Sequence, residues 1–396
     1  MGLQRTAGPL AITPRLLLNE AQMSRNIARM NRRLLSQGVS MRPHVKTAKS
    51  LPIIDRMLAE QPNTKVTVST LAEASHCVDA GIKDILYAVG IVPNKMAAVQ
   101  ALNRRGGQCA VLLDSVVMAR ALAAACSANA TAPSGDGSVG QASLRVYIEL
   151  DVDQHRAGVV PAGAELIEIA HRLRGAPHLQ FAGVMTHAGA SYECRSTDEL
   201  VAMAERERAG AVLARDRLVE QNIACPEVSV GSTPTAVYAR SLAGVTEVRV
   251  GVYVFQDLTM MGLGVCDRDE LALSVMTTVI GHQSKRNCLL VDAGWMALSS
   301  DRSTAKQARD MGYGLVTDDL GGRIQADQLI VSGVNQEHGL VTRRDGAAFD
   351  LSEFPIGTNL RVFPNHACAT AAAFPDYDVE CADGGSARWA RFGGWA

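Results

Sequence analysis

"LRVYIELDVDQHRAGVVPAGAELIEIAHRLRGAPHLQFAGVMTH" (residues 144–187) holds two β-rich runs with a helical pattern between them. The runs at 144–150 and 181–187 are short and apolar and contain β-branched or aromatic residues, which is typical of buried strands. Between them, apolar residues at 162–173 recur every three or four positions, as on one face of a helix. This order predicts a parallel pair of strands joined by a crossover helix.

The same alternation continues on both sides of this segment. Further strands are expected at 40–45, 66–69, 84–89, 109–113, 227–231 and 246–254, and further helices at 21–36, 50–60, 71–80, 94–104, 115–128 and 197–221. Eight strands separated mostly by helices predict an α/β fold, a (β/α)8 barrel of the TIM type, which takes about 250 residues. A doubly wound sheet would show the same alternation, but no GxGxxG follows the first strand.

Near residue 270 the pattern changes to β runs with turn signals. These runs are "LSVMTTVIGH" (273–282), "CLLVDAG" (288–294), "DQLIVSG" (327–333), "HGLVT" (338–342) and "NLRVFP" (359–364). They predict a C-terminal all-β domain. We place the barrel at 20–265 and the β domain at 1–19 and 266–396, and the small, polar residues 129–143 predict an exposed loop.

The composition excludes several classes of function. The 396 residues carry a net charge of -1, with 47% hydrophobic and 20% charged residues, so no electrostatic footprint for nucleic acid is present. No apolar stretch reaches the roughly 18 residues that a membrane span needs. Nine cysteines without a CxxC motif indicate a reducing compartment. The sequence therefore predicts a soluble, cytoplasmic protein.

The segment "MRPHVKTAKS" (41–50) follows the first barrel strand and is unusually basic. It contains Arg42, His44, Lys46 and Lys49 within ten residues. One interpretation is a solvated basic turn. The other is that Lys46, at the end of a strand, is a buried amine that reacts with a carbonyl group.

Other polar residues also follow barrel strands. Arg156 follows the fifth strand, His187 ends the sixth, and "GSTPT" (231–235) follows the seventh. This is the face of a barrel on which active sites are built. "GSTPT" offers backbone N–H groups and hydroxyls suited to a phosphate, although the same residues are also ordinary turn formers.

A candidate metal site lies in "NHACAT" (365–370). On a strand, His366 and Cys368 would face the same side, and imidazole with thiolate suits Zn²⁺. Two ligands are too few for a structural zinc, so water or substrate would complete the shell. The alternative is a core histidine beside a small buried cysteine.

Taken together, seven segments resemble one family. It comprises the fold-type III pyridoxal-phosphate (PLP) enzymes that act on D-3-hydroxy amino acids, namely D-serine dehydratase, D-threo-3-hydroxyaspartate dehydratase and D-threonine aldolase. More distant relatives of this family, the alanine racemases, share the plan of a barrel plus a β domain. The segments are "RPHVKT" (42–47), "ELDVDQHRAGV" (149–159), "THAGASY" (186–192), "VGSTPT" (230–235), "GVYVFQD" (251–257), "QEHG" (336–339) and "PNHACAT" (364–370).

The resemblance implies roles for the residues in these segments. Lys46 corresponds to the lysine that binds PLP covalently, and cationic neighbours in a partly desolvated pocket would lower its pKa. His44 is implied to neighbour it, and Arg156 to lie near the cofactor ring. The residues implied to cradle the phosphate or to lie beside it are Gly231, Ser232, Thr233, Gly251, Val252 and Tyr253.

Arg249 resembles the alanine-racemase arginine that faces the pyridine nitrogen. Many lyases of the family differ there, so an ordinary surface or ion-pair arginine remains the alternative.

The metal motif distinguishes the subfamilies. The aldolases carry His-x-Asp, suited to Mn²⁺ or Mg²⁺, and the dehydratases His-x-Cys, suited to Zn²⁺. His366 and Cys368 therefore favour dehydration of a D-3-hydroxy amino acid to a 2-oxo acid and ammonia, with zinc ahead of manganese or magnesium.

In this reaction Lys46 takes the α-proton, and His187 and Tyr192 either position substrate and relay protons or only line the pocket. The alternative reaction is aldol cleavage to glycine and an aldehyde. A non-catalytic PLP-binding protein would need neither the β domain nor the His-x-Cys motif. Arg302 and His338 are candidate partners for a substrate 3-carboxylate, and the resemblance implies a homodimer.

Overall fold

The structure is a computed structural model that describes residues 12–61, 63–130, 143–324, 327–393 and 395. The chain divides into two compact units. The barrel unit comprises Ser24–Val254, Leu263–Val265 and the residues from Ala390 onwards, and the β unit comprises residues 12–23, Phe255–Gly262 and Cys266–Trp389. Most of the loop expected at 129–143 lies outside the described residues.

Eight parallel strands form one sheet in the barrel unit, in the order β2-β9-β8-β7-β6-β5-β4-β3. Their bounds are β2 Ser40–Met41, β3 Lys65–Val68, β4 Asp84–Gly90, β5 Gln108–Leu113, β6 Leu144–Leu150, β7 Leu179–Thr186, β8 Glu227–Val230 and β9 Glu247–Val248. Just beyond β2, the Thr67 N–H donates to the Pro43 carbonyl and the Val45 N–H donates to the Thr67 carbonyl, both at 2.9 Å. These bonds join the two edges of the sheet, so the predicted (β/α)8 barrel is confirmed.

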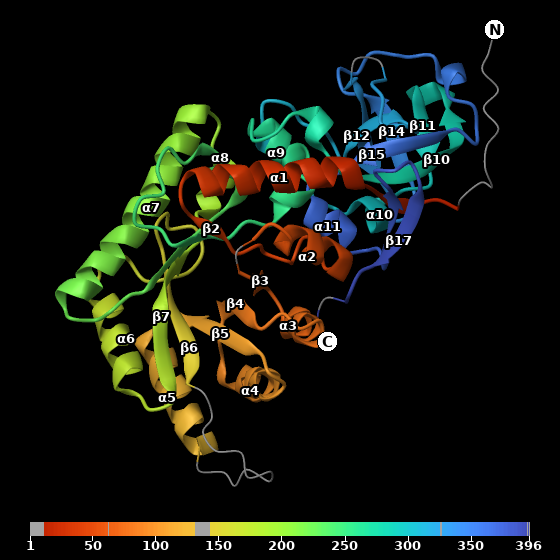
Figure 1. The fold of residues 1–396 in the computed structure, drawn as a ribbon. Coiled ribbons are helices and arrows are strands. Elements are labelled where there is room, and N and C mark those ends of the chain that lie inside the picture. The colour runs from red at the N-terminus through yellow and green to blue at the C-terminus, as the bar shows by residue number, and fades with distance from the viewer. Residues whose placement is uncertain (1–11, 62, 131–142, 325–326, 394, 396) are drawn as a thin grey trace. The chain divides into compact units, whose positions relative to one another are not determined.

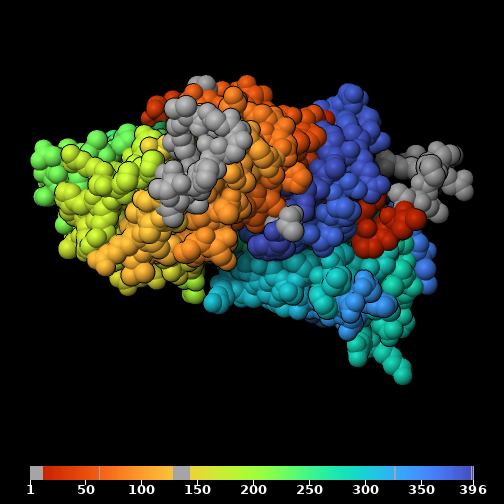
Figure 2. All heavy atoms as spheres, turned by 90° about the horizontal axis from the view of Figure 1, so that it is seen from below, coloured from red at the N-terminus to blue at the C-terminus, as the bar shows by residue number. Residues whose placement is uncertain are grey.

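Helices alternate with these strands along the chain (Figure 1). Their bounds are α1 Glu20–Ser36, α2 Leu51–Leu58, α3 Leu71–Asp79, α4 Met96–Arg104, α5 Val116–Ala130, α6 Ala164–Gly175, α7 Thr197–Glu220 and α8 Thr233–Tyr238. Figure 2 shows one face of these segments, coloured orange through yellow-green. The side chains of strands such as β5 and β8 are mostly buried, so they are shielded from water, as their mostly apolar sequences require.

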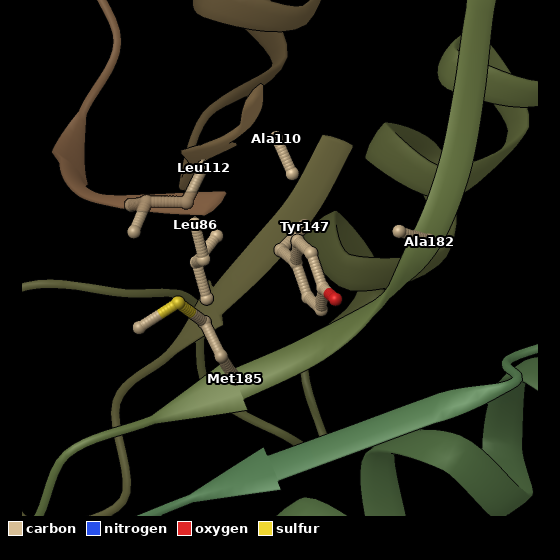
Figure 3. Packing of buried hydrophobic residues seen from close by; sticks show 6 residues of the cluster. All are labelled: Leu86, Ala110, Leu112, Tyr147, Ala182 and Met185. Atoms are coloured by element: carbon tan, nitrogen blue, oxygen red, sulfur yellow. The ribbon is translucent and has the colours of Figure 1, made fainter. Parts of the chain in front are cut away.

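The barrel interior is packed with apolar side chains. Tyr147 lies at the centre of one cluster, shown in Figure 3 with Leu86, Leu112 and Met185. Each of these side chains is at most 2% exposed. Small residues make room for the tyrosine ring, which fits the dense packing of protein interiors.

Charged side chains form a second layer at the amino-terminal ends of the barrel strands. The Arg42 Nε donates to both carboxylate oxygens of Glu247, at 2.9 and 3.0 Å, and its Nη1 donates to Asp84 at 2.9 Å. Lys65 also lies 2.7 Å from Glu247, and Arg145 lies 3.1 Å from Asp84. Arg42 and Glu247 are both buried to 1% exposure, so each charge depends on its partner.

The β unit contains a nine-stranded sheet in the order β11-β14-β13-β12-β15-β10-β1-β16-β17. An additional pairing of β10 with β11 closes six of these strands into a β-barrel, so the predicted C-terminal all-β fold is confirmed. The strand bounds are β1 Arg15–Asn19, β10 Leu273–Gln283, β11 Cys288–Val291, β12 Leu315–Asp318, β13 Leu329–Val334, β14 Gly339–Arg343, β15 Asn359–Phe363, β16 Asp376–Glu380 and β17 Ser386–Ala390. The short helices of this unit are α9 Leu258–Gly262, α10 Trp295–Leu298 and α11 Ala367–Ala371.

Two strand predictions were too long. The run 40–45 forms only β2, because Pro43 cannot donate a further ladder hydrogen bond. The run 246–254 forms only β9 and then a 3-10 helix, η3, at Val252–Val254. Among the described residues, no helix combines the length and the apolar character needed to cross a membrane.

Candidate functional site

Lys46 lies in a tight turn at the carboxyl-terminal edge of the barrel. The Lys49 N–H closes this turn by donating to the Val45 carbonyl at 2.8 Å. Val45 and Thr47 are buried, whereas the Lys46 side chain is exposed. The burial predicted for Lys46 is therefore not found, and Arg42 is the buried cation of the segment instead. The reaction of Lys46 with a carbonyl group stays a prediction.

His44 lies beside this turn as a neutral imidazole. Its Nδ1 accepts a hydrogen bond from the Lys46 N–H at 3.4 Å, and its Nε2 lies 3.4 Å from the Ser69 hydroxyl. Burial, together with the positive charges of Lys46 and Arg249, lowers the pKa of His44 well below its usual value. Nε2 therefore carries the proton and donates a hydrogen bond to the Ser69 hydroxyl.

His187 directly follows β7 and is also neutral. Its Nδ1 donates to the Gly231 carbonyl at 2.6 Å, which leaves Nε2 as an acceptor. Burial and the charge of Lys46 lower the pKa of His187 to about 3. The Tyr192 ring lies 6.3 Å from the His187 ring, so these two predicted residues lie together.

The segment "GSTPT" connects β8 to α8. Gly231 has φ of 147°, and a Cβ there would lie 2.2 Å from the Arg249 carbonyl oxygen, so only glycine fits. Ser232 caps α8, and its hydroxyl lies 2.8 Å from that of Ser191. Among the described residues, the buried hydroxyl of Thr233 has no hydrogen-bond partner.

Glu207, on α7, holds this region together. Its carboxylate accepts hydrogen bonds from the Ala188 N–H at 3.0 Å, the Gly231 N–H at 3.1 Å and the Thr235 hydroxyl at 2.6 Å. It thus joins the segment after β7, the segment after β8 and α8. The carboxylate is fully buried, and this burial raises the pKa of Glu207.

Arg249 follows β9 and is only 5% exposed, which excludes the surface interpretation. Its Nη1 donates to the Ser229 hydroxyl at 2.7 Å and its Nη2 to the Thr186 carbonyl at 2.6 Å. The guanidinium is therefore fixed against the ends of β7 and β8.

The segment from Gly251 to Tyr253 packs on the Lys46 turn. A Cβ at Gly251 would lie 3.0 Å from the Thr47 hydroxyl, so the missing side chain permits this contact. Val252 and Tyr253 are buried, and the Tyr253 hydroxyl has no hydrogen-bond partner among the described residues. Arg156 is more peripheral: its side chain is 56% exposed and pairs with Glu149 at 3.0 Å.

The β unit carries His366 and Cys368, but not on one strand as predicted. β15 ends at Phe363, because Pro364 cannot extend it, and His366 is the N-cap of α11. The two side chains nevertheless form a hydrogen bond, and Cys368 raises the pKa of His366 to about 10. The His366 Nδ1 also lies 3.5 Å from Asp257. Among the described residues, no group of three or more metal-ligating side chains is present.

Arg302 and His338 also lie in the β unit and are not brought together. Arg302 pairs with Asp310 at 2.7 Å and lies 4.9 Å from the Tyr313 ring. His338 is exposed.

Sequence reasoning missed Glu207 and Asp257. Glu207 stands among charged residues of a long helix, where nothing in the sequence separates it from its exposed neighbour Glu205. Asp257 accepts hydrogen bonds from Met260 and Ala367, both at 3.0 Å, and so fixes the start of α11. Its position at the end of "GVYVFQD" was the available signal.

Two family models match the chain. The model described as alanine racemase, N-terminal domain, matches residues 18–258. A model named for serine dehydratase matches residues 272–379.

Known proteins resemble the chain over almost its whole length. D-threo-3-hydroxyaspartate dehydratase of Delftia sp. (strain HT23) is 47% identical over 385 residues, 97% of this chain and 98% of the relative. Its solved structure has a TM-score of 0.91 at 46% identity and covers 97% of this chain and 98% of that one. A cysteine-to-alanine variant of that dehydratase, described as metal-free, gives the same values.

Other relatives are less similar. D-serine dehydratase of Dictyostelium discoideum is 31% identical over 382 residues, 93% of each chain. D-threonine aldolase of Arthrobacter sp is 28% identical over 360 residues, 89% of this chain and 85% of the relative.

Proposed function

Because this chain belongs to the family of the alanine racemase N-terminal domain, we propose that it is a PLP-dependent lyase that dehydrates a D-3-hydroxy amino acid. The products are a 2-oxo acid and ammonia, since water is lost first and then taken up again to release the nitrogen. D-threo-3-hydroxyaspartate is the substrate to test first, because the relative of that name is 47% identical. The observation that carries the proposal is the exposed Lys46 side chain on an otherwise buried turn, with two histidines kept neutral beside it.

The barrel unit fits the cofactor at the carboxyl-terminal ends of its strands. Three buried hydroxyls of the barrel unit, those of Thr67, Thr233 and Tyr253, lack partners among the described residues, and a buried polar group normally has one. Thr233 also stands in the turn that only glycine at 231 permits. We assign the phosphate to Gly231–Thr233 and Gly251–Tyr253, the ring to Arg156 and Arg249, and the aldehyde to Lys46.

The residues of the barrel unit then have distinct roles. Bound PLP supplies the electron sink that stabilises negative charge at the substrate α-carbon. Lys46 would hold the cofactor through its amine, and the same Nζ would accept the substrate α-proton when it is free. Neutral His187 offers Nε2 as an acceptor, and Tyr192 beside it orients the substrate or relays a proton. His44 stays neutral, and it lies between the Lys46 N–H, which donates to its Nδ1, and the Ser69 hydroxyl.

The β unit fits a divalent cation held by His366 and Cys368, with zinc preferred because one donor is a thiolate. The charges of Cys368 and Asp257 both favour a cation at this position. The ion would act as a Lewis acid that makes the departing 3-hydroxyl a better leaving group. Asp257 holds the backbone of α11 and lies against the His366 ring.

Aldol cleavage is the second candidate, supported by the relative named D-threonine aldolase. It would use the same lysine and break the bond between Cα and Cβ instead. Cys368 favours dehydration, since the aldolase pattern has aspartate at this position. We also propose a homodimer, which sedimentation would test, and a cytoplasmic location, which fits nine described cysteines that form no disulfide.

One assay separates these reactions. The purified protein with PLP and zinc is incubated with the D and L forms of threo-3-hydroxyaspartate, serine and threonine. Formation of 2-oxo acid and ammonia from D substrates alone supports dehydration. Glycine and an aldehyde would support the aldolase, and comparable turnover of the L forms would exclude both.

A further inference from the structure

The described end of the chain packs on the barrel unit beside the turn that carries Lys46. We call residues 390–393 and 395 the C-terminal tail. Figure 1 shows the trace after β17 reaching the neighbourhood of α3. Three contacts join the tail to the stretch between Lys46 and α3.

The first contact uses Ser50, the residue before α2. Its backbone has the extended conformation of an N-cap, with φ of -150° and ψ of 124°, yet its side chain makes no capping hydrogen bond. A serine at this position normally accepts from an N–H of the first helical turn. Instead, the buried hydroxyl donates to the Ala390 carbonyl at 2.8 Å. The Ser50 hydroxyl therefore binds the tail and not the first turn of α2.

The second contact is made by Lys49, which closes the Lys46 turn. Lys49 has φ of 45°, a left-handed conformation that residues with side chains seldom adopt. Its carbonyl accepts a hydrogen bond from the Phe392 N–H at 2.8 Å. Its Nζ lies 2.9 Å from the buried carboxylate of Glu73 on α3. An uncommon backbone conformation is thus fixed by the tail and by α3.

The third contact is made by the Phe392 ring, which stacks on His76 of α3. The ring centroids are 4.7 Å apart with 18° between the planes. Beyond it, Trp395 is exposed, and its ring centroid lies 6.0 Å from the Lys49 Nζ. Gly393 is exposed, and a Cβ built there meets no atom within 4 Å.

We infer that the C-terminal tail is a positioning element for Lys46. Lys49 lies three residues after Lys46, and its N–H closes the turn, so the tail limits the conformations of the turn through the Lys49 carbonyl. Loss of the tail lowers the fraction of molecules in which Lys46 meets the cofactor aldehyde, and the apparent affinity for PLP falls in proportion. This inference rests on the proposed role of Lys46.

Four variants of the full chain test the inference. Phe392→Pro removes the N–H that donates to Lys49, whereas Phe392→Ala keeps that N–H and removes the ring. Ser50→Ala removes one hydroxyl without removing a helix cap. Gly393→Ala is the matched control, because Gly393 is exposed and an added Cβ meets no atom within 4 Å.

Two quantities are measured for each variant: hydrogen exchange of the peptide covering 44–52, and PLP affinity from spectral titration. The melting temperature is measured beside them, so that a local change can be told from a loss of overall stability. We expect Phe392→Pro to exchange faster in this peptide and to bind PLP about tenfold more weakly, the effect of one lost hydrogen bond. Phe392→Ala and Ser50→Ala should show the same changes more weakly, and Gly393→Ala none.

Wild-type exchange and affinity in both Phe392→Pro and Ser50→Ala would overturn the inference. If wild-type protein binds no PLP at Lys46, the proposed function fails instead. The exchange data still decide whether the tail fixes the turn, since faster exchange supports it and unchanged exchange overturns it.

Discussion

Glu207 is the residue on which the proposed phosphate cradle depends most. Its carboxylate accepts three hydrogen bonds from three separate segments, and an amide in its place would turn one N–H group toward a donor. We expect Glu207→Gln to lower the free energy of unfolding by about 1–3 kcal/mol, the cost of an unsatisfied buried group. PLP affinity should fall as well, because the Thr235 hydroxyl loses its carboxylate acceptor beside the cradle.

Urea unfolding and PLP titration measure both effects. Glu205→Gln is the matched control, since Glu205 lies on the same helix, is 55% exposed and pairs only with Arg208 in the described contacts. If both variants had the same free energy of unfolding and the same PLP affinity, the three hydrogen bonds to Glu207 would not be needed.

At the scale of elements, the strand ends of the barrel depend on buried charge. Burial alone would raise the pKa of Glu247, but Arg42 and Lys65 lower it to about 2. In the unfolded chain a glutamate titrates at about 4.3. The native protein thus gains stability that is complete above about pH 5 and is lost as the pH falls toward 2.

Unfolding by urea between pH 3 and pH 7 tests this contribution. The free energy of unfolding of the wild type should fall on acidification, and Glu247→Gln should be less stable at pH 7 with a weaker dependence on acid. Glu168→Gln, which removes an exposed ion pair with Arg172, serves as control. An unchanged acid dependence in Glu247→Gln would contradict the assignment.

Elements with strong local patterns could be predicted from the sequence, and others could not. The run "LRVYIEL" is buried on both faces, so its apolar character identified β6. β16 and β17 mix polar and apolar residues because one face of each is more exposed, and no run of apolar residues marked them. His366 and Cys368 were identified by their residue types. The strand conformation predicted for them was wrong, because alanine residues after His366 favour a helix.

Contacts between residues far apart in the chain could not be predicted from the sequence. Glu207 meets Gly231 through the packing of α7 on the barrel, and Ser50 meets Ala390 across most of the chain. Neither pair leaves a local trace in the sequence.

In the whole molecule, we propose that the barrel unit binds the cofactor and the β unit binds the metal. A chelator should therefore abolish dehydration without releasing PLP, because different residues hold the two groups. Zinc should restore the activity. Elemental analysis should find the ion in the wild type and in Cys381→Ala, but not in Cys368→Ala. Unchanged turnover after complete metal removal would make His366 and Cys368 structural residues.

The site at which PLP is covalently attached tests most directly whether Lys46 binds the cofactor. The protein is loaded with PLP, reduced with borohydride, digested and analysed by mass spectrometry. We predict that the cofactor mass lies on Lys46, is absent from Lys46→Ala and is unchanged in Lys83→Ala, where Lys83 is an exposed lysine elsewhere on the barrel unit. Attachment to another lysine, or wild-type labelling of Lys46→Ala, would contradict it.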